Sequence, residues 1–398
     1  MDGPMTTNLT LAALGGGTLL VRVGFGWYIG GMARAKNAAG AVLRNLADLA
    51  VAVLFFWAIG MAILNGSAGM ILDVRNHATS AQFVQLALIL IATAPLTGAA
   101  LERCRFFPML AAPALLAGFI VPLCGHWAWH GWLQRLGFFD AAGSAVLHVT
   151  GGVAAFAAAY IAGPRTGKYN RDGSSNLIPG HSVPMASVGI LLMLAGWVPY
   201  LLAATWLHGG LTEHTAMNIL LAGAAGTITA LLLSNARYGK PDVMLTWSGL
   251  LGGLVAITGG AGAFNSIAAV ATGAVAGAIV PTVAVMLDLV WKIDDPAGGV
   301  AVHAFGGAWG TLAVGLFAPS AGWLDTLRQL GIQAIGLIVI AALALAASLA
   351  LFAVLRATTG LRLTESAEYD GADLAEHDLN AYPDFQQTMI KSYHLREA

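Results

Sequence analysis

The chain has 398 residues, of which 58% are apolar and only 10% are charged. A mean hydropathy of +0.74 is well above that of water-soluble globular proteins, so the composition predicts a membrane protein. The formal net charge of −1, with lysine and arginine dispersed between apolar runs, argues against a nucleic-acid-binding surface. Cys104 and Cys124 have neither metal-type nor redox-type spacing, and neither a disulfide nor a metal or organic cofactor is expected.

Eleven apolar runs are long enough to cross a bilayer, which takes about 20 helical residues for about 30 Å of hydrocarbon. They lie at 9–31, 44–65, 81–101, 107–129, 141–163, 182–208, 215–234, 242–260, 264–291, 298–318 and 329–355. The fold class predicted is therefore an all-α polytopic membrane protein. Residues 1–360 form its transmembrane domain, and residues 361–398 form a charged tail.

The distribution of basic residues predicts the orientation of these spans. With the N-terminus outside, the inner loops hold Arg34, Lys36, Arg44, Arg103, Arg105, Arg165, Lys168, Arg171, Arg237, Lys240 and Lys292, and the outer loops hold only Arg75, Arg135 and Arg328. Cytoplasmic loops are enriched in lysine and arginine. We therefore expect the N-terminus outside and the C-terminus inside.

The outer end of the fourth span is rich in aromatic residues and leads to an aspartate, in "CGHWAWHGWLQRLGFFD". Tryptophans here fit the aromatic belt of a membrane interface, and one ring face open to a vestibule would also attract a small cation. Asp140, at the start of the fifth span, is either a helix N-cap or a buried carboxylate that favours a cation. No other carboxylate is expected so close to a histidine span.

Two histidines lie inside expected spans, each followed by paired glycines: His148 with Gly151 and Gly152 in "HVTGG", and His303 with Gly306 and Gly307 in "HAFGG". One intramembrane histidine is often a packing residue, but two in matched positions indicate function. Spans five and ten run in opposite directions. This predicts an inverted repeat of five plus five spans, with one helix added.

The depths of the two histidines in their helices allow the side chains to meet near the membrane midplane. The paired glycines would let the two backbones approach closely. We expect a neutral, hydrogen-bonded imidazole pair in a narrow apolar pore. The tail after Arg362 holds no span and is either a solvated end or a regulatory docking segment on the cytoplasmic face.

Seven stretches spread along the chain resemble the ammonium transporter family (Amt/Mep/Rh). They are "GGMARAKN", "ALERCRF", "DAAGSAVLHVTGG", "HSVPMASVGILLMLAGW", "YGKPD", "DDPAGGVAVHAFGGAWG" and "YDGADLAEHDLNAYPDF". The aspartate eight residues before His148, together with the second histidine, makes the resemblance specific.

The resemblance implies a homotrimer of eleven-helix subunits, each with its own pore, that takes up ammonium across the inner membrane of a bacterium. It implies that Trp129 is the cation–π residue of an outer recruitment site, with Asp140 as its structural or deprotonating carboxylate. His148 and His303 would be the twin histidines of the pore, with Trp197 nearby. Tail residues Asp373, Glu376, His377 and Tyr382 would belong to the segment that responds to a PII-type signal protein.

Several positions depart from the family pattern. The outer gate phenylalanine of the third span falls on Leu88, and the second gate phenylalanine becomes Tyr200. The recruitment-site serine becomes Ala204, with Thr205 next to it as a candidate substitute, and an aspartate usual before the tenth-span histidine becomes Gly298. Arg22 stands within the first span, and its expected partner is Asp48 on the second.

The leading hypothesis is net electrogenic ammonium transport. Ammonium is held near Trp129, loses its proton with Asp140 involved, and crosses as NH₃ along His148 and His303 while the proton follows; methylammonium should compete. A first alternative is a non-conducting or weakly conducting ammonium sensor of the same fold. A haem electron carrier with the two histidines as axial ligands and a CO₂ channel of the Rh type are weaker alternatives. No enzymatic activity is expected.

Overall fold

The computed structural model describes residues 4–67, 71 and 79–383, so Arg75 and the last fifteen residues of the tail lie outside the described part. Within that part the chain is helical, with two isolated backbone bridges, Cys104 with Arg362 and Tyr169 with Ser175. Both cysteines are buried and unpaired, as expected.

The first half of the chain forms helices that break into short α and π segments in three of the expected spans. They are α1 (Pro4–Thr18), α2 (Leu20–Met32), η1 (Ala35–Asn37), α3 (Ala38–Phe55), η2 (Phe56–Gly60), α4 (Met61–Asn65), α5 (Ser80–Ala99), α6 (Phe106–Met109), α7 (Ala111–Leu115), η4 (Leu116–Ile120), α8 (Val121–Gly125), η5 (His126–His130), α9 (Trp132–Leu136), η6 (Ser144–Val149) and α10 (Thr150–Ala162).

The second half has longer uninterrupted helices, apart from one π segment before α15. They are α11 (Val183–Leu207), α12 (Thr215–Tyr238), α13 (Val243–Ile257), α14 (Ser266–Leu289), η7 (Val300–Phe305), α15 (Gly306–Phe317), α16 (Trp323–Ala357), α17 (Glu365–Asp370) and α18 (Ala372–His377). Side-chain caps begin four of the long helices of the bundle: Thr79, Ser182, Asp242 and Asn265 each accept a hydrogen bond from the first turn.

Ten helices of the described part are long and apolar enough to cross a membrane. They correspond to ten of the eleven expected spans. The expected eighth span corresponds to α13, which is apolar but only 15 residues long. A multi-pass helical membrane protein is thus established, and the eleventh crossing stays a prediction.

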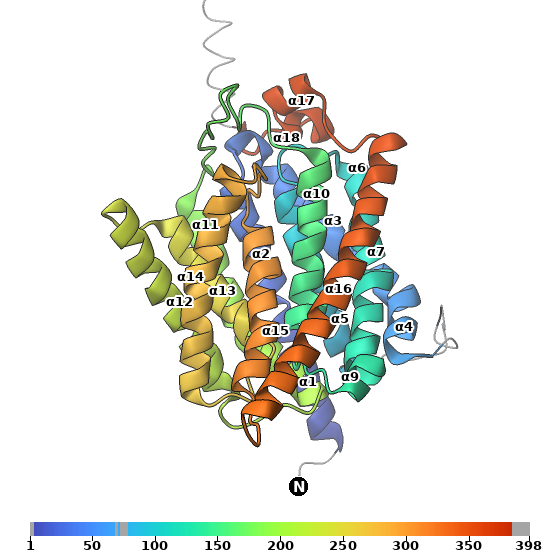
Figure 1. Cartoon of the computed structure of the whole chain (residues 1–398). Helices are drawn as coiled ribbons and strands as arrows, with labels where there is room; N and C mark the ends of the chain where they lie inside the picture. The colour runs from blue at the N-terminus through green and yellow to red at the C-terminus, as the bar shows by residue number, and fades with distance from the viewer. Residues whose placement is uncertain (1–3, 68–70, 72–78, 384–398) are drawn as a thin grey trace, which may run out of the picture.

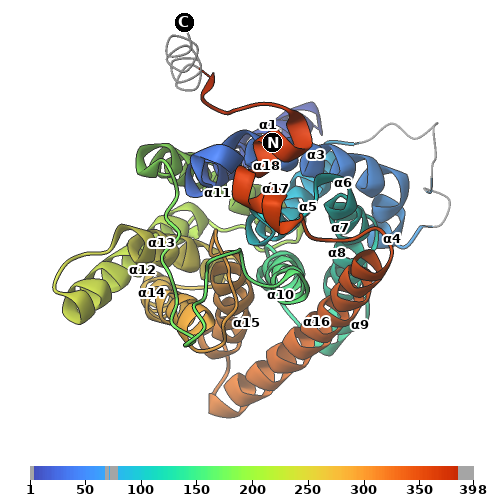
Figure 2. The same ribbon diagram turned by 90° about the horizontal axis from the view of Figure 1, so that it is seen from above.

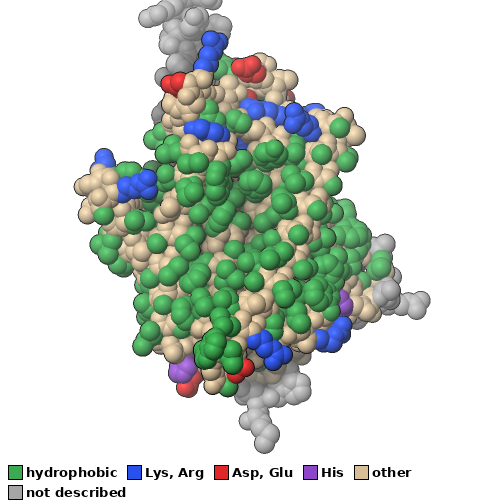
Figure 3. Space-filling view, viewed as in Figure 1, with side chains coloured by type: hydrophobic (Ala, Val, Ile, Leu, Met, Phe, Trp, Pro, Cys, Tyr) green, Lys and Arg blue, Asp and Glu red, His purple; other side chains and the backbone are tan. Residues whose placement is uncertain are grey.

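The helices form one bundle in which α2 packs against α11. Helix α10 packs against α5 and α16, and α16 also packs against α15 (Figures 1 and 2). Helices α12, α13 and α14 pack together on one side of it. The start of α1 lies at the end of the bundle opposite α17 and α18 (Figure 1). In Figure 3, hydrophobic side chains cover the middle of the visible face, and lysine and arginine gather towards its two ends. That is the pattern a bilayer requires.

A buried ion pair joins three helices inside the bundle. The Arg22 guanidinium on α2 lies 3.1 Å from the Asp48 carboxylate on α3, and both side chains are almost fully buried. Thr93 and Thr97 of α5 donate hydrogen bonds of 2.6 and 2.5 Å to the same carboxylate. The expected pairing of Arg22 with Asp48 is confirmed, and the hydroxyls of α5 complete it.

Replacing Asp48 by Asn is expected to destabilise the protein by about 3–5 kcal/mol, because the Arg22 charge is left buried without its counter-ion. Thermal unfolding of the purified protein in detergent measures the loss. The matched control is the double variant Arg22→Met/Asp48→Leu, which removes both charges and is expected to unfold at a higher temperature than Asp48→Asn. Equal unfolding temperatures for Asp48→Asn and wild type would show that the pair contributes no stability.

Candidate functional site

The two intramembrane histidines lie in direct contact. The Nδ1 atom of His148 on η6 is 2.9 Å from the Nδ1 atom of His303 on η7, and the ring centroids are 5.0 Å apart. His148 is fully buried, whereas His303 is partly exposed. The expectation that the two side chains meet is confirmed, and the distance is that of a hydrogen bond. Because the rings touch, no porphyrin fits between them, and the haem alternative fails on geometry.

The paired glycines bring the two backbones together. A Cβ atom on Gly152 would lie 2.1 Å from a backbone nitrogen of the segment that carries His303. A Cβ atom on Gly307 would lie 2.6 Å from a backbone oxygen of the segment that carries His148. Gly151 approaches the backbone of α5 in the same way, while a Cβ on Gly306 would make only ordinary contacts. Three of the four glycines are therefore needed for close packing.

An aspartate stands eight residues before each histidine and anchors the segment that carries it. The Asp140 carboxylate accepts hydrogen bonds from the backbone N–H groups of residues 143–146. The Asp295 carboxylate accepts from those of residues 299–301. Each segment starts after a glycine with positive φ, Gly143 at 90° and Gly298 at 69°. The two segments thus match in spacing, capping and π-helical form.

This match corrects two expectations drawn from the sequence. The sequence predicts no other carboxylate as close to a histidine span as Asp140, and the family pattern places at Gly298 an aspartate that this chain lacks. In the structure, Asp295 holds the second segment as Asp140 holds the first. The equal spacing from aspartate to histidine was the signal available in the sequence. Burial raises the pKa of each carboxyl to about 6. The hydrogen bonds from the backbone N–H groups act in the opposite direction and lower that pKa.

Tyr200 covers the side of the histidine pair nearer to Asp140, which the predicted orientation makes the outer side. Its hydroxyl lies 2.5 Å from the carbonyl oxygen of Ala142 and 3.2 Å from Nε2 of His148. Trp197, one turn earlier on α11, stacks on the His148 ring with centroids 5.5 Å apart. Leu88 is buried in α5 and lines neither of the two cavities described below, one beside Asp140 and one beside His303. Of the two expected gate positions, Tyr200 contacts His148 directly.

A cavity of about 260 Å³ lies near Asp140 and contains Trp129 in its wall. It is called the outer cavity here, because the predicted orientation places it towards the outer face. The Trp129 indole N–H donates to the carbonyl oxygen of Asp140 at 2.7 Å. Ala204 and Thr205 are fully buried and do not line this cavity, and the Thr205 hydroxyl donates to the helix carbonyl of Leu201. Thr205 therefore does not supply the hydroxyl that Ala204 lacks.

His208, which no pattern in the sequence singled out, stacks on Trp129 with ring centroids 4.0 Å apart and an interplanar angle of 17°. Its Nδ1 donates to the carbonyl oxygen of Ala141 at 2.8 Å, and its Nε2 is buried with no hydrogen-bond partner among the described residues. Burial lowers the pKa of His208 to about 4, so the ring is neutral near pH 7. One face of the expected cation–π residue is thus covered by imidazole.

Replacing His208 by Ala is expected to uncover that face of Trp129. A cation over an indole gains about 0.5–2 kcal/mol, so the ammonium concentration at half-saturation should fall by about two- to thirtyfold. Isothermal titration of the detergent-purified protein with ammonium checks this. His208→Phe is the matched control, because it also loses the bond to Ala141 but still covers the ring. An equal gain in both variants would contradict the covering role.

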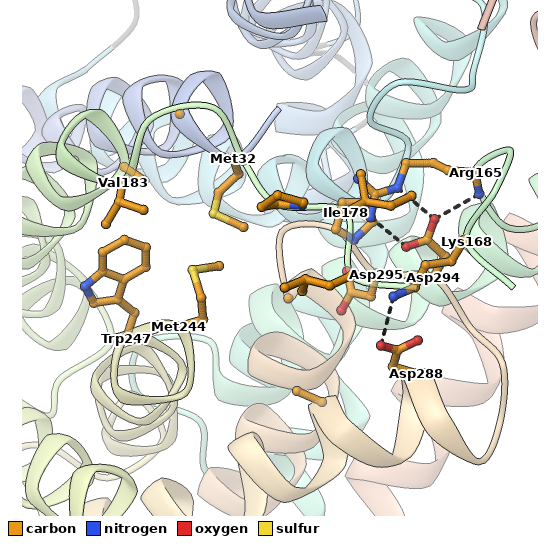
Figure 4. A pocket seen from close by; sticks show the side chains of 18 of the residues that line it. Met32, Arg165, Lys168, Ile178, Val183, Met244, Trp247, Asp288, Asp294 and Asp295 are labelled. Carbon is orange, nitrogen blue, oxygen red and sulfur yellow. Dashed lines mark hydrogen bonds and ion pairs between the residues drawn. The ribbon is translucent and has the colours of Figure 1, made fainter. Parts of the chain in front are cut away.

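A second cavity lies on the His303 side of the pair and is called the inner cavity, because the predicted orientation places it towards the cytoplasm. His303, Trp197, Phe25 and Tyr28 line its narrow part, and Gly298 lines both this part and a wider cavity of about 340 Å³. Figure 4 shows the wider cavity, with Met32, Met244 and Trp247 on one side and aspartates on the other. Apolar side chains thus dominate the passage next to the histidine, and charge appears at its open end.

Ion pairs fix the charged side of this inner cavity. Arg165 pairs with Asp294 at 2.9 Å, and Lys168 pairs with Asp288 at 2.9 Å (Figure 4). Arg165 also lies 3.4 Å from the Glu102 carboxylate. Burial alone would raise the pKa of Asp294, but the charges of Arg103 and Arg165 outweigh it and hold that pKa at about 2. Asp294 is therefore ionised at neutral pH, and its charge is balanced by neighbouring arginines.

The tail packs against the same end of the bundle. The Asp373 carboxylate accepts from the backbone N–H groups of residues 39 and 40 at the start of α3. Glu376 accepts from the backbone N–H of Phe106, and the His377 ring lies edge-on to the Phe106 ring. The Tyr382 hydroxyl lies 2.5 Å from Nε2 of His181, in the loop before α11. All four tail residues singled out in the sequence therefore contact the membrane domain.

The sequence is similar to those of known membrane proteins of one family. The sequence model described as Ammonium Transporter Family matches residues 9–382. Ammonium transporter Amt2 of Archaeoglobus fulgidus is 34% identical, with 92% of this chain and 86% of the relative covered. Ammonium transporter Amt1 of Haloferax mediterranei is 32% identical over 91% of this chain and 76% of the relative.

Solved structures agree on the fold. The structure of a protein described as a sensor Amt protein superposes with a TM-score of 0.86 at 32% identity, covering 93% of this chain and 98% of the other. Candida albicans Mep2 superposes with a TM-score of 0.79 at 24% identity over 90% of this chain and 86% of the other, which supports the fold alone. The match along nearly the whole chain shows that this protein belongs to the ammonium transporter family.

Proposed function

We propose that the protein moves ammonium across the inner membrane through the passage that contains His148 and His303. The observation that carries the proposal is the 2.9 Å contact between the two imidazoles, set between an outer and an inner cavity. A buried imidazole pair with this geometry accepts a proton at one ring and releases it from the other. A merely structural histidine has no need of a second one in a matched segment.

In the proposal, ammonium is selected over K⁺ because it can lose a proton and not because of its size. A bare cation pays a large desolvation cost in an apolar passage unless ligands replace its water. Ammonium avoids that cost by giving up a proton, and K⁺ does not have this option. In the proposal, ammonium is held in the outer cavity near Trp129 and Asp140, NH₃ crosses along the imidazoles, and the proton passes through them, so transport is electrogenic.

Topology and assembly are part of the proposal. Eleven crossings, with α13 as the eighth, put the N-terminus outside and the tail at the cytoplasmic face. The inverted five-plus-five repeat is supported by the matched Asp140–His148 and Asp295–His303 segments. We also propose a homotrimer with one pore per subunit. The docked residues Asp373, Glu376, His377 and Tyr382 are the proposed contact region for a PII-type signal protein.

A sensor is the second candidate, and two observations in the outer half of the passage favour it. The Tyr200 hydroxyl closes the outer side of the pair, and His208 covers Trp129. The similarity to a solved protein described as a sensor Amt protein points the same way. In that case ammonium binds in the outer cavity and the response passes through the docked tail to a partner.

Uptake of radiolabelled methylammonium into proteoliposomes tests the proposed substrate. Uptake that unlabelled ammonium suppresses and that equal concentrations of K⁺ leave unchanged supports the transport of ammonium and its analogues. Uptake no faster than in protein-free liposomes, with measurable ammonium binding in detergent, would replace the transporter by the sensor.

A further inference from the structure

Tyr200 shares its hydroxyl between the wall of the passage and the histidine pair. The oxygen lies 2.5 Å from the carbonyl oxygen of Ala142 and 3.2 Å from Nε2 of His148. Tyr200, Ala142 and His148 are all fully buried. Such groups need partners within the protein, so their hydrogens can be assigned from the hydrogen-bond pattern.

The single hydroxyl hydrogen belongs on the bond to Ala142. Two oxygens 2.5 Å apart require a hydrogen between them, and a carbonyl can only accept. The Tyr200 oxygen then offers His148 a lone pair and no hydrogen. Nε2 of His148 must therefore carry a hydrogen and donate it to Tyr200, since two facing lone pairs in a buried site would repel.

The positions of the other imidazole hydrogens in the pair follow from this assignment. A neutral imidazole carries one hydrogen, so Nδ1 of His148 is a bare acceptor. The 2.9 Å contact then requires that Nδ1 of His303 donates to it. His303 is left with Nε2 unprotonated, and His303 is the partly exposed member that lines the inner cavity. The pair has a hydrogen at its outer end and a lone pair at its inner end.

That arrangement is the one left after a proton has moved inwards. An inward transfer begins with a lone pair on Nε2 of His148, which takes a proton from ammonium and leaves NH₃. The Nδ1 hydrogen of His148 then moves to Nδ1 of His303, and the Nε2 hydrogen of His303 leaves towards the inner cavity. One proton enters the pair and one leaves it. The hydrogens then lie on Nε2 of His148 and Nδ1 of His303, the arrangement that the hydrogen bond to Tyr200 favours.

We propose that Tyr200 is a positioning residue that holds the histidine pair in this post-transfer state. While its hydroxyl accepts from His148, the pair has no outer lone pair and cannot take a proton from ammonium in the outer cavity. Another inward transfer requires the hydroxyl to leave and both rings to exchange their hydrogens. The inference rests on the proposed proton path through the histidines and adds a control step to it.

The test uses Tyr200→Phe in the full-length protein, because phenylalanine keeps the ring and removes only the hydroxyl. Solid-state ¹⁵N NMR of histidine-labelled protein in lipid reads which nitrogen of His148 is protonated, with its signals assigned by their loss in His148→Ala. The matched control is Tyr160→Phe on the exposed side of α10, 60% exposed, which removes a hydroxyl far from the pair.

The wild type is expected to show His148 protonated at Nε2. Tyr200→Phe is expected to shift the tautomer ratio of His148 by about three- to tenfold towards Nδ1–H, the effect of losing one hydrogen bond. The ammonium-evoked current in proteoliposomes is expected to rise by a similar factor. Tyr160→Phe should reproduce the wild type in both measurements.

The spectra decide the inference independently of transport. His148 protonated at Nδ1 in the wild type, or an unchanged ratio in Tyr200→Phe, would overturn the role of Tyr200 even if both proteins conduct. A shifted ratio in a protein that carries no current would uphold the hydrogen-bond assignment and remove the proposed transport function instead.

Discussion

Replacing Asp140 by Ala is expected to abolish ammonium-evoked current and to lower the unfolding temperature strongly. The carboxylate satisfies the backbone N–H groups of residues 143–146, and a buried unsatisfied donor costs about 1–3 kcal/mol. Without that anchor, η6 no longer holds His148 against His303. Current recordings and thermal unfolding in detergent measure the two effects.

Asp140→Asn separates the two roles considered for this aspartate. The amide keeps one acceptor oxygen, so part of the anchor remains, but the negative charge is lost. Stability close to wild type with no current would assign Asp140 to cation stabilisation, and loss of both would assign it to anchoring. Asp295→Ala is the matched control at the inner segment and should destabilise by a comparable amount. Wild-type stability and current in Asp140→Ala would contradict both roles.

Removing either histidine is also expected to reduce the ammonium-evoked current strongly. His148→Ala and His303→Ala are each expected to reduce the current by about 100-fold or more, the lower range of what a positioned proton-transfer group contributes. The remaining ring has no partner at 2.9 Å and cannot pass a proton on. His303→Gln is a useful control, since it keeps a hydrogen-bonding side chain of similar reach but does not titrate near pH 7.

Stability must be measured in the same preparations, because both rings are packed side chains. Trp197 stacks on His148, and loss of the imidazole alone opens a cavity. Variants that unfold at the wild-type temperature yet carry no current support the proton path. Currents that persist unchanged in both alanine variants would end the proposal that the imidazoles carry the proton.

Span positions and the meeting of the two histidines could be predicted from the sequence because both follow from strong local rules. About 20 apolar residues mark a span, and an ionisable residue within one needs a partner. The same rule gave the partner of Arg22, since Asp48 was the carboxylate within reach on the next span. Helix α13, with 15 residues, is shorter than the length rule requires, so the eleventh crossing is not established by length and stays a prediction.

The outer cavity could not be predicted in the same way. The family motif predicts that Thr205 could replace the hydroxyl that Ala204 lacks. The contacts of the Thr205 hydroxyl, however, depend on its rotamer and on the nearby carbonyl of Leu201. His208 lies one helical turn after Ala204, outside the motif that contains Ala204. It covers one face of Trp129, which comes from another segment, by stacking on that ring. Only tertiary structure brings those two rings together.

Asp295 is a different kind of omission. Its spacing to His303 was visible in the sequence, but the family pattern places an aspartate at the position of Gly298 and so draws attention away from residue 295. The structure assigns the role through hydrogen-bond donors, because an aspartate that accepts from residues 299–301 is a cap regardless of motif register.

In the proposed mechanism the charge of ammonium crosses as a proton that passes through the histidine pair. Solid-supported-membrane electrophysiology measures this charge movement, with an ammonium jump applied to proteoliposomes of wild type and of His148→Ala. We expect a wild-type current that the variant loses at equal protein density. No current from folded wild-type protein that still binds ammonium would contradict it and would establish the sensor in its place.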